Sequence, residues 1–279
     1  MQSIPELTLR SGITLPHIGL GTYSLKGQAG ANAIANGIRL GYRLLDSAFN
    51  YENEGTLGAA IRSSGIPREE LLVTSKLPGR HHAYNLAIQT IEESLFRAGL
   101  SYYDMYLIHW PNPRVDLYVE AWQAILEAKK RGLVRVAGVC NFLPEHLERL
   151  WAETGELPEV NQIELHPYFN QAELREYHKK NKIQTESWSP LGRGSDLLQN
   201  NKIVELAKKY DKTPSQIVLR WHIQLGALPI PKSTGESHLL QNLSVFDFAL
   251  DAADEEQINL LARADGRLHD QDPAVYEEF

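Results

Sequence analysis

Short runs of β-branched and apolar residues alternate along this chain with longer stretches in which apolar residues recur at helical spacing. Eight of the short runs are predicted as strands, at residues 17–21, 42–47, 71–76, 104–109, 135–139, 160–164, 183–187 and 227–231. The stretches between them include NLAIQTIEESLFRAGL and YVEAWQAILEAKKRGL, and several such stretches end at glycine, a common helix stop. Alternating strands and helices favour a parallel sheet, and eight such units predict an α/β fold, the (β/α)8 TIM barrel.

An open, doubly wound sheet is the competing architecture. A dinucleotide-binding fold of that kind carries G-x-G-x-x-G directly after its first strand. The chain has only Gly19-Leu20-Gly21-Thr22 there, without the third glycine, and no G-x-x-x-x-G-K-[ST] occurs elsewhere. The first unit is therefore not a mononucleotide-binding half, and a nucleotide must bind in another way.

Two segments lie outside the eight units. Residues 6–16, ELTLRSGITLP, predict a β-hairpin that turns at Ser11-Gly12 and plugs the bottom of the barrel. Residues 245–265 predict an extra helix, capped near Asp251 and followed by a polar tail. No linker or shift in composition divides the chain, so we expect one barrel domain over residues 1–279.

Composition narrows the classes of function. Lys and Arg total 28 against 35 Asp and Glu, so the net charge of −7 disfavours nonspecific binding to nucleic acid or anionic membrane. An anionic ligand must then be held by local groups. The single cysteine, Cys140, excludes an intrachain disulfide and fits a reducing compartment. With no signal-like or membrane-spanning apolar run, the expectation is a soluble, cytoplasmic protein.

Polar residues stand at or just beyond the C-terminal ends of most predicted strands. They are Asp46, Lys76, His109, Asn141, Gln162, Ser187, Trp188 and Lys232. In a closed barrel these strand ends meet at one rim, where the active sites of this fold lie. A single charged residue at a strand end is usually a solvated loop residue, but an ordered series on consecutive strands indicates a site.

Four side chains, Asp46, Tyr51, Lys76 and His109, form a coherent chemical set. A carbonyl under hydride attack develops negative charge on its oxygen and needs a proton. Tyrosine is a reluctant acid with a pKa of ~10, and a nearby ammonium favours its ionised form. The aspartate would hold Lys76 charged, and the histidine would donate a hydrogen bond to the carbonyl oxygen.

Six ordered motifs resemble those of the aldo-keto reductase superfamily, nearest to the bacterial diketogluconate and methylglyoxal reductases. The motifs are G-L-G-T at 19–22, G-Y-R-L-L-D-S-A with Y-E-N-E at 41–54, T-S-K-L at 74–77, L-I-H-W-P at 107–111, N-Q-I-E at 161–164 and I-P-K-S at 230–233. The resemblance covers essentially the whole chain. It implies reduction of aldehydes or ketones by direct hydride transfer from NADPH, and a monomeric protein.

The resemblance also implies catalytic roles. Tyr51 would be the proton donor, Lys76 would depress the pKa of Tyr51, and Asp46 would pair with Lys76. His109 would orient the substrate carbonyl. The substrate would enter a pocket walled by Tyr23, Phe49, Trp110 and the tail from Pro273 to Phe279, and would contact Tyr51 and His109.

A cofactor site is implied along the barrel rim. Asn141 and Gln162 would hold the nicotinamide carboxamide, Trp188 would stack on the ring, and Ser189, Pro190, Leu191 and Gly192 would cover the pyrophosphate. The 2′-phosphate would bind to Lys232, Ser233 and Thr234, and the adenine would contact His238, Gln241 and Asn242. Gly21, Thr22 and Asp46 complete the expected cofactor-binding set.

Three departures from the family pattern modify these expectations. Cys140 replaces the usual serine before Asn141, and Pro78 replaces a tryptophan, which would reshape the substrate pocket. His238 stands where relatives place arginine, and a histidine is mostly uncharged at neutral pH. We therefore expect NADPH preference through Lys232 with weak discrimination, so that NADH is also accepted.

Two alternatives from other classes stay open at this stage. The barrel could bind NADP(H) as a sensor or partner subunit with incidental catalysis. It could also be a metal-dependent hydrolase or isomerase that uses His109, His166 and Asp46. No H-x-H or H-E-x-x-H pattern supports a metal site, and Lys76 would repel the ion, so no metal is predicted. The substrate is left open among diketogluconates, methylglyoxal and aromatic aldehydes.

Overall fold

Eight parallel strands follow one another around a barrel in the computed structural model, which describes residues 4–279. They are β3 (Leu20–Gly21), β4 (Leu44–Asp46), β5 (Leu72–Leu77), β6 (Tyr103–Ile108), β7 (Val134–Cys140), β8 (Val160–Glu164), β9 (Gln184–Trp188) and β10 (Leu228–Pro229). The amide of Gly19 donates to the Pro229 carbonyl at 3.0 Å, and that of Gly21 to the Pro231 carbonyl at 3.1 Å. These bonds join the first strand to the last, which confirms the barrel over the open sheet.

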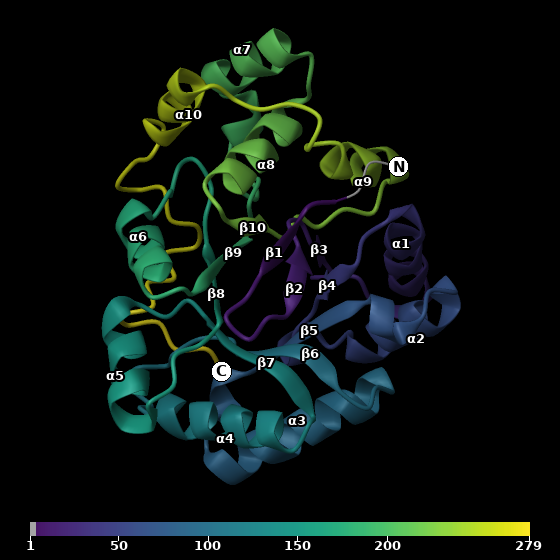
Figure 1. Cartoon of the computed structure of the whole chain (residues 1–279), viewed down its shortest axis with the longest axis vertical. Coiled ribbons are helices and arrows are strands. Elements are labelled where there is room, and N and C mark those ends of the chain that lie inside the picture. Colours follow the sequence, from purple (N-terminus) through teal and green to yellow (C-terminus); the bar gives the residue numbers. More distant parts are fainter. Residues whose placement is uncertain (1–3) are drawn as a thin grey trace.

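Helices surround the strands over the described residues 4–279 (Figure 1). They are α1 (Gly27–Leu40), α2 (Glu54–Ser64), α3 (Tyr84–Ala98), α4 (Tyr118–Lys130), α5 (Pro144–Thr154), α6 (Ala172–Lys180), α8 (Pro214–Gln224) and α9 (Glu236–Leu243). Several end as the sequence predicts, because a glycine in the left-handed conformation follows the last turn. Gly41 after α1, with φ of 118°, and Gly99 after α3, with φ of 65°, are two examples.

Two further helices pack on one another outside this ring. The predicted extra helix is α10 (Ala252–Asn259), and the Asp251 side chain caps it by accepting from the Asp254 amide. Its neighbour α7 (Asn201–Tyr210) was not singled out from the sequence. The Lys209 ammonium joins the pair by bonding Asp251 and Asp254.

The N-terminal hairpin closes the bottom of the barrel. Strands β1 (Glu6–Thr8) and β2 (Thr14–Pro16) pair antiparallel, with Leu7 opposite Leu15. Figure 1 shows the hairpin lying across the open end of the strands. Leu9 and Leu15 are buried against Leu44, Met105 and other residues of the barrel interior. The hairpin therefore continues the core, and the predicted plug is confirmed.

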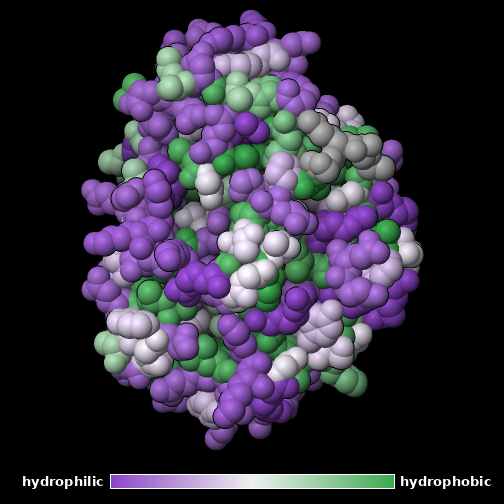
Figure 2. All heavy atoms as spheres, viewed as in Figure 1, coloured by the Kyte–Doolittle hydropathy of each residue, from purple (hydrophilic) through white to green (hydrophobic). Residues whose placement is uncertain are grey.

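The strands that close the barrel, β3 and β10, are shorter than the predicted runs 17–21 and 227–231. Proline explains the short ladder, because Pro229 and Pro231 accept hydrogen bonds but have no N–H to donate. The hairpin face of the molecule is hydrophilic around its outer helices, and hydrophobic residues gather toward its centre (Figure 2).

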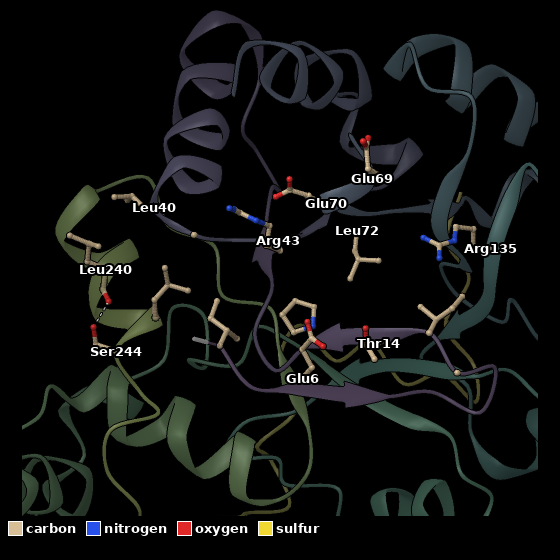
Figure 3. A pocket seen from close by; sticks show the side chains of 16 residues that line it. Glu6, Thr14, Leu40, Arg43, Glu69, Glu70, Leu72, Arg135, Leu240 and Ser244 are labelled. Atoms are coloured by element: carbon tan, nitrogen blue, oxygen red, sulfur yellow. Dashed lines mark hydrogen bonds between the residues drawn. The ribbon is translucent and has the colours of Figure 1, made fainter. Parts of the chain in front are cut away.

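A cavity of about 870 Å³ lies at this bottom end, between the hairpin, the start of β5 and helices α1 and α9 (Figure 3). It contains none of the predicted catalytic residues. Its two arginines already have partners, since Arg43 donates to the carbonyls of Ile38 and Tyr42, and Arg135 pairs with Asp104. The reactive side chains lie at the opposite end of the barrel.

Candidate active site

Four side chains predicted to act together meet at the C-terminal ends of β4, β5 and β6. The Lys76 Nζ lies 2.7 Å from Asp46 Oδ2 and 3.5 Å from the Tyr51 hydroxyl. The rings of Tyr51 and His109 are in edge contact, with centroids 5.8 Å apart. The structure therefore brings the whole set together around one phenol.

Tyr51 reaches the lysine because the chain turns sharply after β4. Residues Phe49–Tyr51 form a single 3-10 turn, and Glu52 ends it in the left-handed conformation with φ of 52°. Lys76 Nζ also donates to the Ser47 carbonyl at 2.7 Å and lies 4.9 Å from the centre of the Tyr51 ring. Three oxygens thus surround an ammonium that is completely buried.

The protonation states follow from burial and charge. Burial raises the pKa of Tyr51, and the opposing charge of Lys76 only partly offsets this, so the pKa is raised to about 12. The Lys76 charge lowers the Tyr51 pKa, as expected, but the opposite effect of burial on that pKa is larger. Burial alone lowers the pKa of Lys76, but Asp46 and the other neighbours raise it above its usual value. At neutral pH the site therefore holds a protonated phenol beside a permanent cation.

A buried hydrogen-bond network orients Gln162 next to the tetrad of Asp46, Tyr51, Lys76 and His109. Its Nε2 donates to Asp46 Oδ1 at 2.8 Å and to Glu186 Oε2 at 3.0 Å. Both N–H groups are used, so the Gln162 carbonyl oxygen is left as an acceptor. Burial raises the pKa of Glu186 to about 7. Sequence analysis missed Glu186, although its position opposite Gln162 in the β8–β9 register places both in one barrel layer.

Asn141 and Trp188 are fixed to one another. The Trp188 indole N–H donates to Asn141 Oδ1 at 2.7 Å, and Asn141 Nδ2 donates to the His109 carbonyl at 3.0 Å. Asn141 has a left-handed backbone, with φ of 62°, which asparagine tolerates better than most residues. The second amide N–H of Asn141 has no hydrogen-bond partner among residues 4–279.

A cleft of about 740 Å³ opens above these groups. The predicted residues that line it are Gly21, Tyr23, Asp46, Tyr51, His109, Trp110, Asn141, Gln162, Trp188, Ser189, Pro190, Leu191 and Lys232. The cleft is also lined by Arg193, His269, Gln271, Tyr276 and Glu278, which were not named individually from the sequence. Most of the predicted site therefore forms one continuous cleft.

An aldo/keto reductase family model matches residues 17–263 of this chain. The chain belongs to the aldo/keto reductase family. Over 279 residues it is 49% identical to 2,5-diketo-D-gluconic acid reductase B of Corynebacterium sp., with all of both chains covered. Methylglyoxal reductase DkgA of Escherichia coli K12 is 42% identical over 260 residues, which cover 93% of each chain. The resemblance inferred from the six motifs is thereby confirmed.

Solved structures of the family agree with this fold. A Gox0644 variant in complex with NADPH superposes with a TM-score of 0.94 at 41% identity, covering 99% of this chain and 100% of that one. A Bombyx mori aldo-keto reductase in complex with NADP gives a TM-score of 0.90 at 32% identity, covering 100% of this chain and 99% of that one. The expected NADPH cofactor agrees with the ligands of these relatives.

Phe49, Thr22 and Gly192 were predicted at the site of this aldo/keto reductase but do not line the cleft. Phe49 is buried beneath the guanidinium of Arg97, 4.1 Å from its ring centre, and it contacts His81. Its ring packs against these two side chains and is absent from the cleft lining. The buried Thr22 hydroxyl donates to the Asp46 carbonyl, so it supports the rim from below. Gly192, in the left-handed conformation, belongs to the loop that passes Ser195.

The residues expected at the adenine end lie on α9 and the loop before it, beyond the cleft lining. Ser233, Thr234, His238 and Gln241 are partly or fully exposed, whereas Asn242 is buried beside the Tyr42 hydroxyl. Lys232 is exposed and forms no ion pair with any residue of 4–279. The Lys232 ammonium, exposed beside the cleft, is therefore suited to bind a phosphate group. Asn242, on α9, instead packs against Tyr42.

The site offers amides, an indole face and an unpaired ammonium, and this donor set fits a nicotinamide dinucleotide phosphate. It does not fit a metal ion. Within residues 4–279, no cluster of three or more His, Cys, Asp or Glu side chains is arranged to hold one. His166 instead contacts Glu164 at 2.9 Å, in a buried structural pair. No helix in the same range has the length and apolar character needed to cross a membrane.

Proposed function

We propose that this aldo/keto reductase reduces aldehydes and ketones to alcohols with a hydride from NADPH, and that Tyr51 supplies the proton. One observation carries the proposal. The Tyr51 hydroxyl lines the cleft 3.5 Å from the buried Lys76 ammonium, with His109 against the same ring. A protonated phenol held beside a cation suits a carbonyl oxygen that gains negative charge during reduction.

The tetrad divides the proton transfer between its members. NADPH supplies the hydride when it is bound. Tyr51 gives its proton to the carbonyl oxygen, and the phenolate that remains is stabilised by Lys76, whose own charge is balanced by Asp46 at 2.7 Å. Burial makes a phenolate costly in this position, and it raises the Tyr51 pKa to about 12 even though the Lys76 charge opposes the shift. His109 donates to the same carbonyl oxygen and sets its direction.

The cofactor groups would be held by the amide network and Lys232. The Gln162 oxygen and the free Asn141 N–H match the donor and acceptor of a carboxamide, and Trp188 offers an aromatic face to the nicotinamide ring. Lys232 would bind the 2′-phosphate. Because His238 stands where the family pattern has arginine, we propose that NADH is accepted as well.

The relatives suggest the class of substrate. Small dicarbonyls such as methylglyoxal and keto-sugar acids such as 2,5-diketogluconate are the first candidates, since reductases of these compounds share 42% and 49% identity with the chain. NADPH oxidation should be followed across a panel of aldehydes, ketones and keto-sugars. Tight NADPH binding with slow turnover of every carbonyl would instead indicate a sensor or partner subunit.

Tyr51→Phe tests the proton donor. The variant keeps the ring and loses only the hydroxyl, so NADPH binding should persist while kcat falls by roughly 10²–10⁴. Tyr84→Phe, a matched change at a partly exposed position on α3, should leave kcat unchanged. Near-normal turnover in Tyr51→Phe would show that another group donates the proton.

A further inference from the structure

A carboxylate from the C-terminal segment touches the predicted substrate-orienting histidine. The Glu278 Oε1 atom lies 2.7 Å from His109 Nδ1, and both side chains are largely buried at the cleft. At this distance the two groups form an ion pair whenever the imidazole is protonated. Glu278 comes from a region 169 positions after His109, and no motif in the sequence links the two.

Glu278 is held in its ionised form by several donors. The Gly79 amide donates to Oε2 at 3.0 Å, and Asn50 Nδ2 donates to Oε1 at 2.8 Å. Burial by itself raises the pKa of Glu278, but the charge and proton of His109, with the Gly79 and Asn50 bonds, lower it to about 2. The proton between Glu278 and His109 therefore resides on the imidazole.

This placement of the proton has a consequence for catalysis. A neutral imidazole carries one N–H, so a ring protonated at Nδ1 has only a lone pair at Nε2. Such a ring cannot donate to a substrate carbonyl through Nε2. No protein group within residues 4–279 bonds Nε2, and His109 lines the cleft. The ring offers a donor to the cleft only when both nitrogens carry protons.

We propose that Glu278 is a positioning residue that holds His109 as an imidazolium, with Nδ1–H toward the carboxylate and Nε2–H toward the substrate carbonyl. The inference rests on the proposed carbonyl reduction and refines it. A cationic donor stabilises a developing oxyanion more strongly than a neutral one. Glu278 balances that charge, so the cleft gains an electrophile without a net buried charge.

Several contacts hold the C-terminal segment that carries the Glu278 carboxylate. The Glu278 amide donates to Asn112 Oδ1 at 3.1 Å, and Asn112 Nδ2 donates to the Glu278 carbonyl at 2.8 Å. A Cβ at Gly79 would lie 2.5 Å from that carbonyl, so only glycine lets the segment pass this closely. Tyr276 packs on Trp110, with ring centres 4.5 Å apart, and fixes the segment from the other side.

Other charged and titratable groups face this pair, and they bear on its pH dependence. Tyr51 and, behind it, Lys76 lie on one side, with Asp46 balancing the lysine. The charge of Glu278 acts to raise the pKa of two buried groups, His82 and Cys140. Arg80 bonds the Asn50 that holds Glu278. Burial lowers the pKa of His82 to about 4 and raises that of Cys140, so both stay uncharged near neutral pH.

Glu278→Gln tests the inference through the pH profile of kcat at saturating NADPH. The substitution removes the charge while keeping the side-chain size. We expect kcat at neutral pH to fall about tenfold or more, the effect of weakening one charge-assisted hydrogen bond. The alkaline limb of the profile should also move to lower pH, and Glu278→Asp should retain more activity than Glu278→Gln. Glu92→Gln, which changes an exposed carboxylate on α3 that pairs with Arg131 outside the cleft lining, should match the wild type.

A second readout does not require turnover. In ¹⁵N-histidine-labelled protein, with the His109 signals assigned by their loss in His109→Gln, both ring nitrogens should be protonated at neutral pH. In Glu278→Gln one of them should lose its proton. A neutral His109 in the wild type, or a Glu278→Gln profile identical to that of the wild type while Tyr51→Phe is inactive, would overturn the inference and leave the proposed function intact. A wild type that reduces no carbonyl would refute the proposed function, and the ¹⁵N signals would still decide the state of the ion pair.

Discussion

Lys76→Met removes the cation at the centre of the site and keeps the length of the side chain. In the wild type the Lys76 ammonium is fully buried, and Asp46, whose side chain is 6% exposed, lies 2.7 Å from it. The substitution leaves Asp46 with the single bond from Gln162 and leaves the Ser47 carbonyl without its donor. An uncompensated carboxylate would then be enclosed in the barrel.

The expected cost is large because neither partner can recover its water. Breaking a buried ion pair by removing one partner costs about 3–5 kcal/mol. Asp46→Asn with Lys76→Met removes the stranded charge and keeps an acceptor for Gln162, so most of that loss should be recovered. Turnover should be lost in both variants, because neither has an ammonium beside Tyr51. The double variant should therefore regain stability without regaining activity.

Urea unfolding followed by fluorescence of the five tryptophans measures the free energies. Lys26→Met is the matched control, since Lys26 and Glu52 also lie 2.7 Å apart but their side chains are 54% and 76% exposed. Solvent screens such a pair, so the control should unfold almost as the wild type does. Equal losses in Lys76→Met and Lys26→Met, or no recovery in the double variant, would refute the reasoning from burial.

Three further predictions concern Glu186, helix α2 and the cofactor. Burial raises the Glu186 pKa to about 7, so the folded state binds this proton more tightly than the unfolded chain does, and the wild type should lose stability as pH rises from about 4.5 to about 7. The thermal midpoint of Glu186→Gln should change less than that of the wild type across this range. Parallel curves of midpoint against pH for the two proteins would contradict this. A Cβ at Gly58 would lie 1.8 Å from the Ala98 carbonyl, so Gly58→Ala should cost about 1–3 kcal/mol or more in urea unfolding, whereas Gly55→Ala on the same helix, 3.4 Å from the Arg97 carbonyl, should be neutral or stabilising. Lys232→Met should lower kcat/KM for NADPH by about tenfold or more and leave NADH unaffected; a wild-type preference for NADPH above about a thousandfold would contradict the weak discrimination we propose.

Much of the fold and part of the site are local properties of the sequence. Helical spacing and the glycines that end helices predicted the repeating units, and the turn at Ser11-Gly12 predicted the hairpin. Asp46, Lys76 and His109 were found because a parallel barrel gathers the ends of its strands at one rim. Each of these inferences needs only residue type, spacing and the topology of one fold.

The remaining features depend on which distant segments come into contact. The packing of Phe49 beneath Arg97, and not in the cleft wall, depends on how α3 lies against the turn after β4. The protonation of Tyr51 is set by burial, which residue type alone does not reveal. Glu278 reaches His109 only because the last residues fold back over Gly79, and no periodicity in the sequence records that path. The sequence by itself thus determined the barrel and the reactive residue types, whereas tertiary packing decided their charge states and partners, because desolvation and ion pairing depend on distances in space and not on separation along the chain.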